Sequence, residues 1–286
     1  MKIALGTVQF GMKYGVANTT GRVSRAGVKE ILEVASSLGV DTLDTAAAYG
    51  DSEKALGDAG VSGYRVISKV PPRAEGVESP VEWVQRNIEN SLANLKIHSL
   101  YGLMLHRPLD LLHANGVELY EALLAVKEKG LVRKIGVSVY GPEDLEKLSS
   151  FSFDVVQAPM NVIDQRLVRS GWLDRLNRAG TEVYIRSAFL QGLLLMPKDQ
   201  RPAYFAPWKA LLADYDAWIA GQCLSPLQGC LGYLNQYPEI SRVVIGVESA
   251  SQLREAVSAV TASVASVPEG VQTNDLHLIN PALWTL

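Results

Sequence analysis

Short apolar runs alternate with longer amphipathic runs along the whole chain. In the longer runs apolar residues recur every three or four positions, whereas the short runs are rich in β-branched residues. The first pattern predicts helices and the second predicts strands. The predicted strands are 2–8, 41–45, 65–70, 100–105, 134–139, 154–158, 181–187 and 242–246. The predicted helices are 24–38, 52–57, 80–96, 117–129, one with Pro142 in its first turn, 171–178, 225–236 and 251–261.

This strict alternation of strands and helices predicts a parallel sheet covered by helices. Strands such as those around 66–67 and 243–245 are apolar at consecutive positions, which is typical of strands buried on both faces. Eight strand–helix pairs within 286 residues favour a closed (β/α)8 TIM barrel over a doubly wound open sheet. We therefore expect one barrel domain spanning residues 1–286.

One connection departs from the pattern. Residues 190–224 separate the seventh strand from the seventh helix, whereas such loops usually contain about 2–6 residues. Pro197, Pro202 and Pro207 interrupt its first half, and 208–220 reads as an additional helix. Long loops in compact domains are usually functional, so we interpret this loop as a lid, with a passive surface insertion as the alternative.

Composition and charge exclude several classes of partner. The chain is 48% hydrophobic and 20% charged, and its net charge is −3, which gives no basic surface for nucleic acid or an anionic membrane. No apolar run approaches the ~20 residues of a membrane helix, and the N-terminus lacks a signal-peptide pattern, so we expect a cytoplasmic protein. Cys223 and Cys230 have no metal-ligand spacing, so we expect no metal site. The oligomeric state is left open.

Titratable side chains follow three neighbouring strands where those strands end. Asp44 and Tyr49 follow the second strand, Lys69 ends the third and His106 follows the fourth. Each residue alone has an ordinary explanation, such as a turn aspartate or a solvated lysine. In a (β/α)8 barrel, however, the carboxyl ends of all strands meet at one mouth, where active sites lie. Their coincidence therefore predicts a catalytic cluster.

The same residues carry a family resemblance. Residues 44–50 read DTAAAYG and are followed by Ser52-Glu53 and Leu56-Gly57, which together resemble the signature of the aldo-keto reductases. The segments 67–69, 105–106, 136–138 and 156–161 are similar to later motifs of that family, in the same order. The resemblance covers essentially the whole chain. It implies hydride transfer between a nicotinamide cofactor and a carbonyl.

By this resemblance Asp44, Tyr49, Lys69 and His106 form the catalytic tetrad. Hydride addition to a carbonyl carbon leaves an alkoxide that needs a proton. A free phenol has a pKa near 10, and a buried ammonium close by lowers the pKa of a phenol by roughly 1–3 units. Tyr49 would be the acid, Lys69 that ammonium and Asp44 its counter-ion. His106 would orient the carbonyl oxygen or help to relay the proton.

No GxGxxG follows a strand here, so a dinucleotide would lie across the barrel mouth. The resemblance implies which residues would contact it. Ser138 and Gln157 would hold the carboxamide, with Val139 at the family's usual asparagine position. Arg186 occupies the position of the nicotinamide-stacking aromatic ring, where it would be either a variant stack, as in some bacterial members, or part of a structural ion pair. The other expected cofactor contacts are Thr7, Asp44, Ser187, Phe189, Gln191, Gly192, Gly246, Ser249, Gln252 and Arg254.

The resemblance favours NADPH, and Glu248 leaves NADH open. A carboxylate there would repel a 2′-phosphate or accept from a ribose hydroxyl, unless it only stabilises the start of a helix. Expected contacts to a small carbonyl substrate are Phe10, Tyr49, His106 and Arg107, whereas Met12, Tyr14 and Trp284 are further candidates. Two alternatives remain: a nicotinamide-binding regulatory or sensor subunit with little turnover, and a barrel enzyme of another superfamily.

Overall fold

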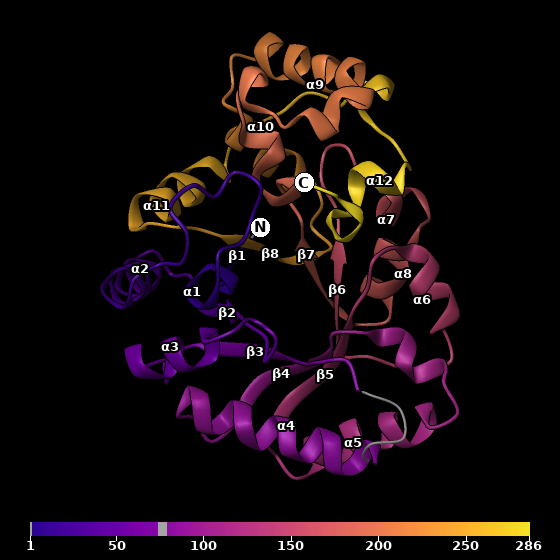
Figure 1. The fold of residues 1–286 in the computed structure, drawn as a ribbon. Helices are drawn as coiled ribbons and strands as arrows, with labels where there is room; N and C mark the ends of the chain where they lie inside the picture. The colour runs from indigo at the N-terminus through magenta and orange to yellow at the C-terminus, as the bar shows by residue number, and fades with distance from the viewer. Residues whose placement is uncertain (1, 74–78) are drawn as a thin grey trace.

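Eight parallel strands close into a barrel in chain order in the computed structural model, which describes residues 2–73 and 79–286 (Figure 1). The first strand pairs with both the second and the last, since Leu5 lies opposite Leu43 on one side and Ile245 on the other. The strands are β1 (Ile3–Gly6), β2 (Thr42–Asp44), β3 (Arg65–Val70), β4 (Leu100–Leu105), β5 (Val132–Ser138), β6 (Val155–Pro159), β7 (Glu182–Arg186) and β8 (Ile240–Gly246). The predicted (β/α)8 barrel is confirmed.

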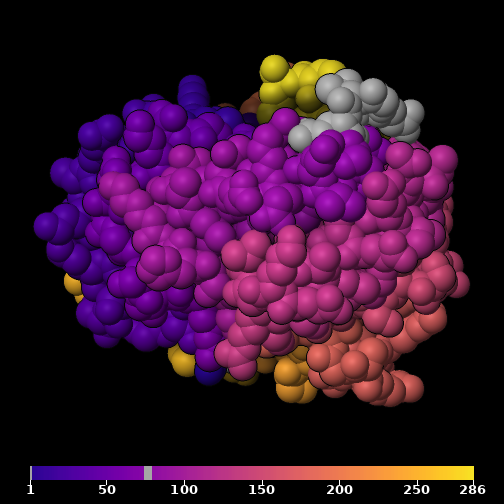
Figure 2. Space-filling view, turned by 90° about the horizontal axis from the view of Figure 1, so that it is seen from below, coloured from indigo at the N-terminus to yellow at the C-terminus, as the bar shows by residue number. Residues whose placement is uncertain are grey.

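Helices form an outer ring around the strands (Figure 1). They are α1 (Val8–Gly11), α2 (Arg25–Ser37), α3 (Ser52–Ala59), α4 (Pro80–Leu95), α5 (Gly116–Glu128), α6 (Pro142–Lys147), α7 (Arg166–Arg169), α8 (Trp172–Arg178), α9 (Lys209–Gly221), α10 (Pro226–Asn235), α11 (Ala250–Ala259) and α12 (Leu276–Ile279). The 3₁₀ helices are η1 (Pro108–Leu112), η2 (Leu190–Leu195), η3 (Lys198–Gln200), η4 (Ala203–Trp208), η5 (Glu269–Val271) and η6 (Pro281–Leu283). Seen from below, the first half of the chain forms a convex outer surface (Figure 2).

Serine caps begin several of these helices. The hydroxyls of Ser24, Ser79 and Ser225 accept hydrogen bonds from main-chain N–H groups in the first turns of α2, α4 and α10. Such caps satisfy donors that have no partner inside a helix, each typically worth about 1 kcal/mol.

No helix among the described residues is long and apolar enough to cross a membrane.

The barrel interior is plugged by apolar side chains below its mouth. Side chains alternate along β3, so Ser68 faces outward, where its hydroxyl donates to Glu53 of α3 at 2.5 Å. Ile67 and Lys69 therefore face inward, and Ile67 packs with Met104, Val155 and Tyr184. Lys69 thus stands one layer above this apolar cluster.

Several boundaries differ from the predicted ones. The first strand ends at Gly6 instead of residue 8, because Thr7 begins the short helix α1 and its hydroxyl donates to the carbonyl of Asp44. β5 and β8 begin two residues earlier than expected, at Val132 and Ile240. The short helices α7 and α12 were not predicted, since four-residue helices have too little periodicity to detect.

The long loop is folded rather than extended. It contains the predicted additional helix, α9, and before it three 3₁₀ helices. The loop also holds the chain's tail: the ring of Phe205 lies 4.9 Å from that of Trp284, and Trp208 Nε1 donates to the Asp275 carboxylate at 3.0 Å. Trp284, a candidate for the substrate pocket, therefore packs on the loop.

Candidate active site

A buried ion pair lies at the mouth of the barrel. Lys69 Nζ donates to Asp44 Oδ1 at 2.7 Å and to the main-chain oxygen of Thr45 at 3.1 Å. Its third contact is the hydroxyl of Tyr49, at 3.5 Å. The side chain of Lys69 is fully buried, and that of Asp44 is 4% exposed. The sequence-predicted lysine, aspartate and tyrosine are thus brought together.

Lys69 is charged at neutral pH. Burial alone would lower the pKa of an ammonium, but the Asp44 carboxylate and Tyr49 together outweigh burial and hold the pKa of Lys69 above its usual value. Asp44 is itself fixed at both oxygens, because Gln157 Nε2 donates to Oδ2 at 2.7 Å. Ser138 in turn donates to Gln157 Oε1 at 3.2 Å. Residues of β2, β3, β5 and β6 therefore hold the ammonium in place.

Close backbone packing positions Tyr49. A Cβ on Gly11 of α1 would lie 1.7 Å from the carbonyl oxygen of Tyr49, so this approach requires glycine. Gly50 has a φ of 55°, in the left-handed region that favours glycine. The hydroxyl of Ser52 also donates to the carbonyl of Thr7 at 2.8 Å. The DTAAAYG segment is thus clamped between β1, α1 and α3.

His106 completes the cluster as a neutral imidazole. Its ring lies edge-on to that of Tyr49, with 5.9 Å between ring centres. Burial, with added repulsion from Lys69 and Arg186, lowers the pKa of His106 to about 4. Nδ1 is buried and has no hydrogen-bond partner in the described part of the chain. An uncharged ring beside the phenol can donate one N–H to an oxygen without competing for the proton.

Arg186 lies at the end of β7 and stacks on Tyr140. Its guanidinium carbon is 4.9 Å from the ring centre, Nη2 donates to the carbonyl of Val139 at 2.9 Å and Nη1 contacts Ser187 Oγ at 3.2 Å. Among residues 2–73 and 79–286 no carboxylate pairs with it, so the structural ion pair considered from the sequence is absent. Sequence reasoning missed Tyr140, although an aromatic residue directly after a strand end was a usable signal.

A cavity of about 680 Å³ runs from this cluster across the barrel mouth. Its volume suits a cofactor-sized ligand. Most of the predicted cofactor contacts line it: Thr7, Asp44, Gln157, Arg186, Ser187, Phe189, Gln191, Gly192, Gly246 and Gln252. Tyr49 lines it too. The sequence prediction and the cavity thus coincide at the end nearest the ion pair and along the loop after β7.

Three predicted cofactor contacts do not line this cavity. Ser138 bonds to Gln157 instead. Ser249 caps α11, where its hydroxyl accepts from the N–H of Gln252 at 3.3 Å. Arg254 lies on the exposed outer face of the same helix. Helix geometry turns successive side chains by about 100°, so Arg254 points away from the face of Gln252.

Of the four predicted substrate contacts, Tyr49 lines this cavity, whereas Phe10, His106 and Arg107 are not among its lining residues. His106 lies beside Tyr49, but the placements of Phe10 and Arg107 differ from the prediction. Phe10 is 1% exposed and packs in the core between α1 and the barrel, so it offers no surface to a ligand. Arg107 is outside the lining of the cavity; it pairs with Asp110 at 2.5 Å and donates to the carbonyl of Arg73 at 3.2 Å. Arg107 is therefore engaged with Asp110 and Arg73, although it follows His106 directly in the sequence.

The loop after β1 contributes residues that sequence analysis did not assign to the cofactor. Tyr14 lines the cavity and its hydroxyl accepts from Gln191 at 3.2 Å. Thr20 donates to Glu248 at 2.6 Å across the cavity mouth. Gln9 Oε1 is buried, has no partner in the described residues and lies against Gly246, where any Cβ would collide with it. These are long-range contacts, which the one-dimensional pattern does not contain.

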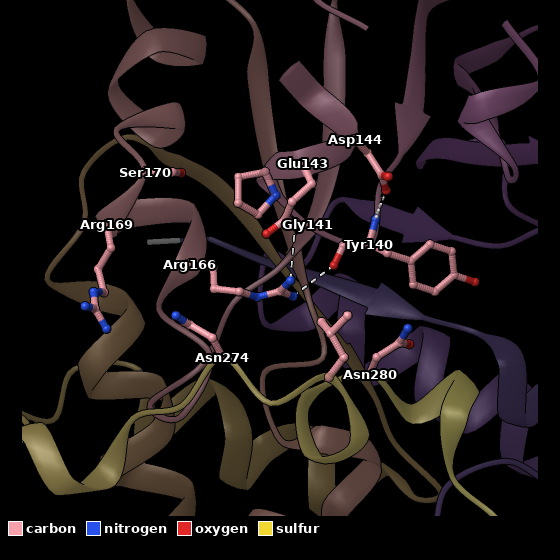
Figure 3. A pocket seen from close by; sticks show the side chains of 11 residues that line it. Tyr140, Gly141, Glu143, Asp144, Arg166, Arg169, Ser170, Asn274 and Asn280 are labelled. Carbon is pink, nitrogen blue, oxygen red and sulfur yellow. Dashed lines mark hydrogen bonds and ion pairs between the residues drawn. The ribbon is translucent and has the colours of Figure 1, made fainter. Parts of the chain in front are cut away.

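A second cavity of about 570 Å³ lies on the other side of Tyr140 (Figure 3). Arg166 forms part of its wall, and its guanidinium reaches the carbonyl of Tyr140 at 3.0 Å and Glu143 at 3.4 Å. Nε of the same guanidinium pairs with Asp164 Oδ1 at 2.9 Å. The polar groups of this wall are therefore bonded to one another. The Tyr140 ring points away from Arg166 (Figure 3).

The main cavity fits a nicotinamide dinucleotide better than a metal. In the described residues no group of three or more His, Cys, Asp or Glu side chains could hold a metal ion. Unpartnered polar atoms, Arg186 Nε and Gln9 Oε1, belong to residues on two parts of the cavity wall. An elongated polar ligand can use both, because it would extend along the wall between them.

Proteins of known name resemble this chain over most of its length. The chain is 26% identical over 275 residues to the 6-dehydroglucose reductase of Novosphingobium aromaticivorans, which covers 90% of this chain and 87% of that protein. It is 26% identical over 291 residues to the L-galactose dehydrogenase of Arabidopsis thaliana, covering 91% and 85% of the two chains.

Solved structures share the barrel. An aldo-keto reductase of Bacillus halodurans superposes with a TM-score of 0.72 at 20% identity, covering 93% of this chain and 88% of that one. The glycerol dehydrogenase of Gluconobacter oxydans gives 0.68 at 19% identity, covering 92% and 87%. A model of the Aldo/keto reductase family matches residues 2–268. With its closed barrel and this nearly complete match, the chain belongs to the aldo/keto reductase family.

Proposed function

We propose that this protein reduces an aldehyde or ketone, with Tyr49 as the general acid and base. The observation that carries the proposal is the contact of the buried Lys69 ammonium with Asp44 at 2.7 Å and with the Tyr49 hydroxyl at 3.5 Å. A positive charge at that place stabilises the phenolate that remains when Tyr49 gives up its proton. Asp44 and Gln157 keep the ammonium from turning away.

Residues of the cavity such as Gln157 and Arg186 would hold a nicotinamide dinucleotide, which would supply the hydride to the carbonyl carbon. Tyr49 then donates its proton to the carbonyl oxygen of the substrate, and the product is an alcohol. His106 stays neutral near pH 7 and donates a hydrogen bond to the same oxygen, which orients the carbonyl. In the opposite direction Tyr49 takes the proton from the alcohol. Which dinucleotide binds, NADPH as the resemblance favours or NADH, depends on the far end of the cavity.

Polyhydroxy carbonyl compounds are the substrate class that we propose. Three of the similar proteins are named for a sugar or a polyol: 6-dehydroglucose, L-galactose and glycerol. The cavity wall nearest Tyr49 also offers hydrogen-bonding side chains, such as Tyr14 and Gln191, rather than a purely apolar surface. Both facts favour a substrate with several hydroxyl groups.

The test is a matrix of two reduced dinucleotides against a panel of carbonyl compounds. The panel contains simple alkyl and aromatic aldehydes, ketones, and sugars with a free or oxidised carbonyl, and oxidation is followed by the loss of absorbance of the reduced nicotinamide. We expect turnover with at least one carbonyl and the highest kcat/KM among polyhydroxy compounds. Tight dinucleotide binding without oxidation by any carbonyl would favour the sensor subunit instead.

A further inference from the structure

Away from Tyr49, the cavity continues between the loop after β1 and the start of α11. Its wall there includes Thr20, Gly246, Glu248 and Glu255. If hydride transfer takes place at Tyr49, as proposed above, the nicotinamide lies at the catalytic end. The other half of the dinucleotide, which carries the adenosine ribose, must then follow the cavity to this far end.

We propose that Glu248 and Glu255 make this end of the cavity selective for NADH over NADPH. The charged residues that line the cavity, within the described chain, are Asp44, Arg186, Glu248 and Glu255. Asp44 is paired with Lys69 and Arg186 stacks on Tyr140, both at the catalytic end. The far end therefore presents two carboxylates and no lining cation.

Glu248 is poised to accept hydrogen bonds from a sugar. One of its carboxylate oxygens, Oε2, accepts from the hydroxyl of Thr20 at 2.6 Å, which fixes the side chain across the cavity mouth. A carboxylate can accept several donors, and the free 2′- and 3′-hydroxyls of a ribose are donors. The same chemistry, an acidic residue on the 2′-hydroxyl, selects NAD in dinucleotide-binding folds of another architecture.

A 2′-phosphate at this place would meet repulsion. A phosphate monoester carries about −1.5 to −2 charges at pH 7, and two carboxylates beside it raise the cost of binding. Arg254, the cation expected from the sequence, lies on the exposed face of α11, whereas Gln252, Glu255 and Ala256 form the face that lines the cavity. The face of α11 that lines the cavity therefore presents a negative charge, from Glu255, toward a 2′-phosphate.

The start of α11 offers few free donors to offset this charge. Helix N-termini usually attract phosphate through unpaired main-chain N–H groups. Here the N–H of Glu248 donates to Gln252 Oε1 at 2.7 Å, and the N–H of Gln252 donates to Ser249 Oγ at 3.3 Å. Side-chain oxygens of the protein thus already accept from two of the main-chain N–H groups at this turn.

The decisive experiment measures dinucleotide binding without a carbonyl substrate. NADH and NADPH are titrated separately into the purified full-length protein at low and at moderate ionic strength, and the dissociation constants come from fluorescence of the bound nicotinamide. We expect NADH to bind at least about tenfold more tightly, with the difference reduced by salt because repulsion between charges is screened. Glu248→Gln and Glu255→Gln should each tighten NADPH binding, and the double variant should bring the two constants close together.

Glu269→Gln is the matched control, since Glu269 is an exposed glutamate on η5 that does not line the cavity. It should leave both constants unchanged. Tighter binding of NADPH than of NADH by the unmodified protein, or a ratio that neither carboxylate variant alters, would overturn the inference while carbonyl reduction could still be intact. Binding of neither dinucleotide would overturn the proposed function together with it.

Discussion

The guanidinium of Arg186 lies 4.9 Å from the ring centre of Tyr140, although the two residues belong to different strand ends. The stack and the hydrogen bond to the carbonyl of Val139 fix a flat cation at the end of β7. A planar, delocalised cation can also lie against a flat heteroaromatic ring, which an ammonium cannot do as well. We therefore propose that Arg186 holds the nicotinamide ring in the place where an aromatic side chain would otherwise stack.

Replacing Arg186 should weaken dinucleotide binding more than it weakens the fold. We expect Arg186→Ala to raise the dissociation constant about tenfold, because a stacking contact and an adjacent hydrogen bond contribute on the order of 1–2 kcal/mol. Arg186→Lys keeps the charge but loses the plane, and should recover only part of the affinity. Full recovery by lysine would show that charge alone matters and would contradict the stacking role.

Removing one member of the buried ion pair should destabilise the barrel strongly. Lys69→Met leaves the Asp44 carboxylate buried without its cation, so we expect a loss of about 3–5 kcal/mol in the free energy of unfolding, measured with urea. Asp44→Asn with Lys69→Met should recover part of that loss, because no unpaired charge remains. Additive losses in the double variant would contradict the ion-pair account.

Stability should depend on pH through His106. The folded-state pKa of His106, about 4, lies below the ordinary value of 6.5. Between these two pH values His106 is therefore protonated in the unfolded chain but not in the folded protein. Stability therefore falls as the pH drops from about 6.5 to about 4, by on the order of 3 kcal/mol from this group, and is unaffected by it above that window.

His106→Gln provides the comparison, since glutamine keeps a polar side chain and does not titrate. The difference in unfolding free energy between the two proteins, measured at several pH values, should change between pH 6.5 and 4. Carboxylates such as Asp41 and Glu182 also lose stabilising charge in acid, but both proteins contain them. Parallel profiles of the two proteins would contradict the depressed pKa of His106.

Much of the fold followed from the sequence because its signals are local. Strand–helix alternation and the position of strand ends predicted the barrel and the convergence of Asp44, Tyr49, Lys69 and His106. The contacts of Thr20 with Glu248 and of Arg186 with Tyr140 join residues far apart in the chain, so no local pattern contains them. Phe10 was misjudged because a residue after a strand faces either the mouth or the core, and only the turn into α1 decides.

At Val139 the sequence motif does not reveal where the side chain points. From the sequence, this valine replaces an asparagine that would hold the cofactor, which suggests a missing contact. In the structure its side chain is fully buried in the apolar core, while its main-chain N–H donates to the carbonyl of Gln157 at 2.8 Å.

Val139→Asn should therefore not improve cofactor binding. An amide at this buried position costs about 1–3 kcal/mol of stability unless it finds a partner. We expect a lower urea midpoint and an unchanged or weaker affinity for the dinucleotide. A tighter complex, by contrast, would mean that position 139 reaches the cavity after all.

The central claim is that Tyr49 supplies the proton, and a single variant tests it. Tyr49→Phe removes the hydroxyl while keeping the ring that packs against His106. Measured as single-turnover oxidation of the bound reduced dinucleotide by the best carbonyl of the panel, the rate should fall by at least about a thousandfold, which lies in the middle of the range for a lost general acid. The dissociation constant of the dinucleotide should stay within about threefold of the unmodified protein, a change of less than about 1 kcal/mol. Turnover by Tyr49→Phe at close to the unmodified rate would contradict the account.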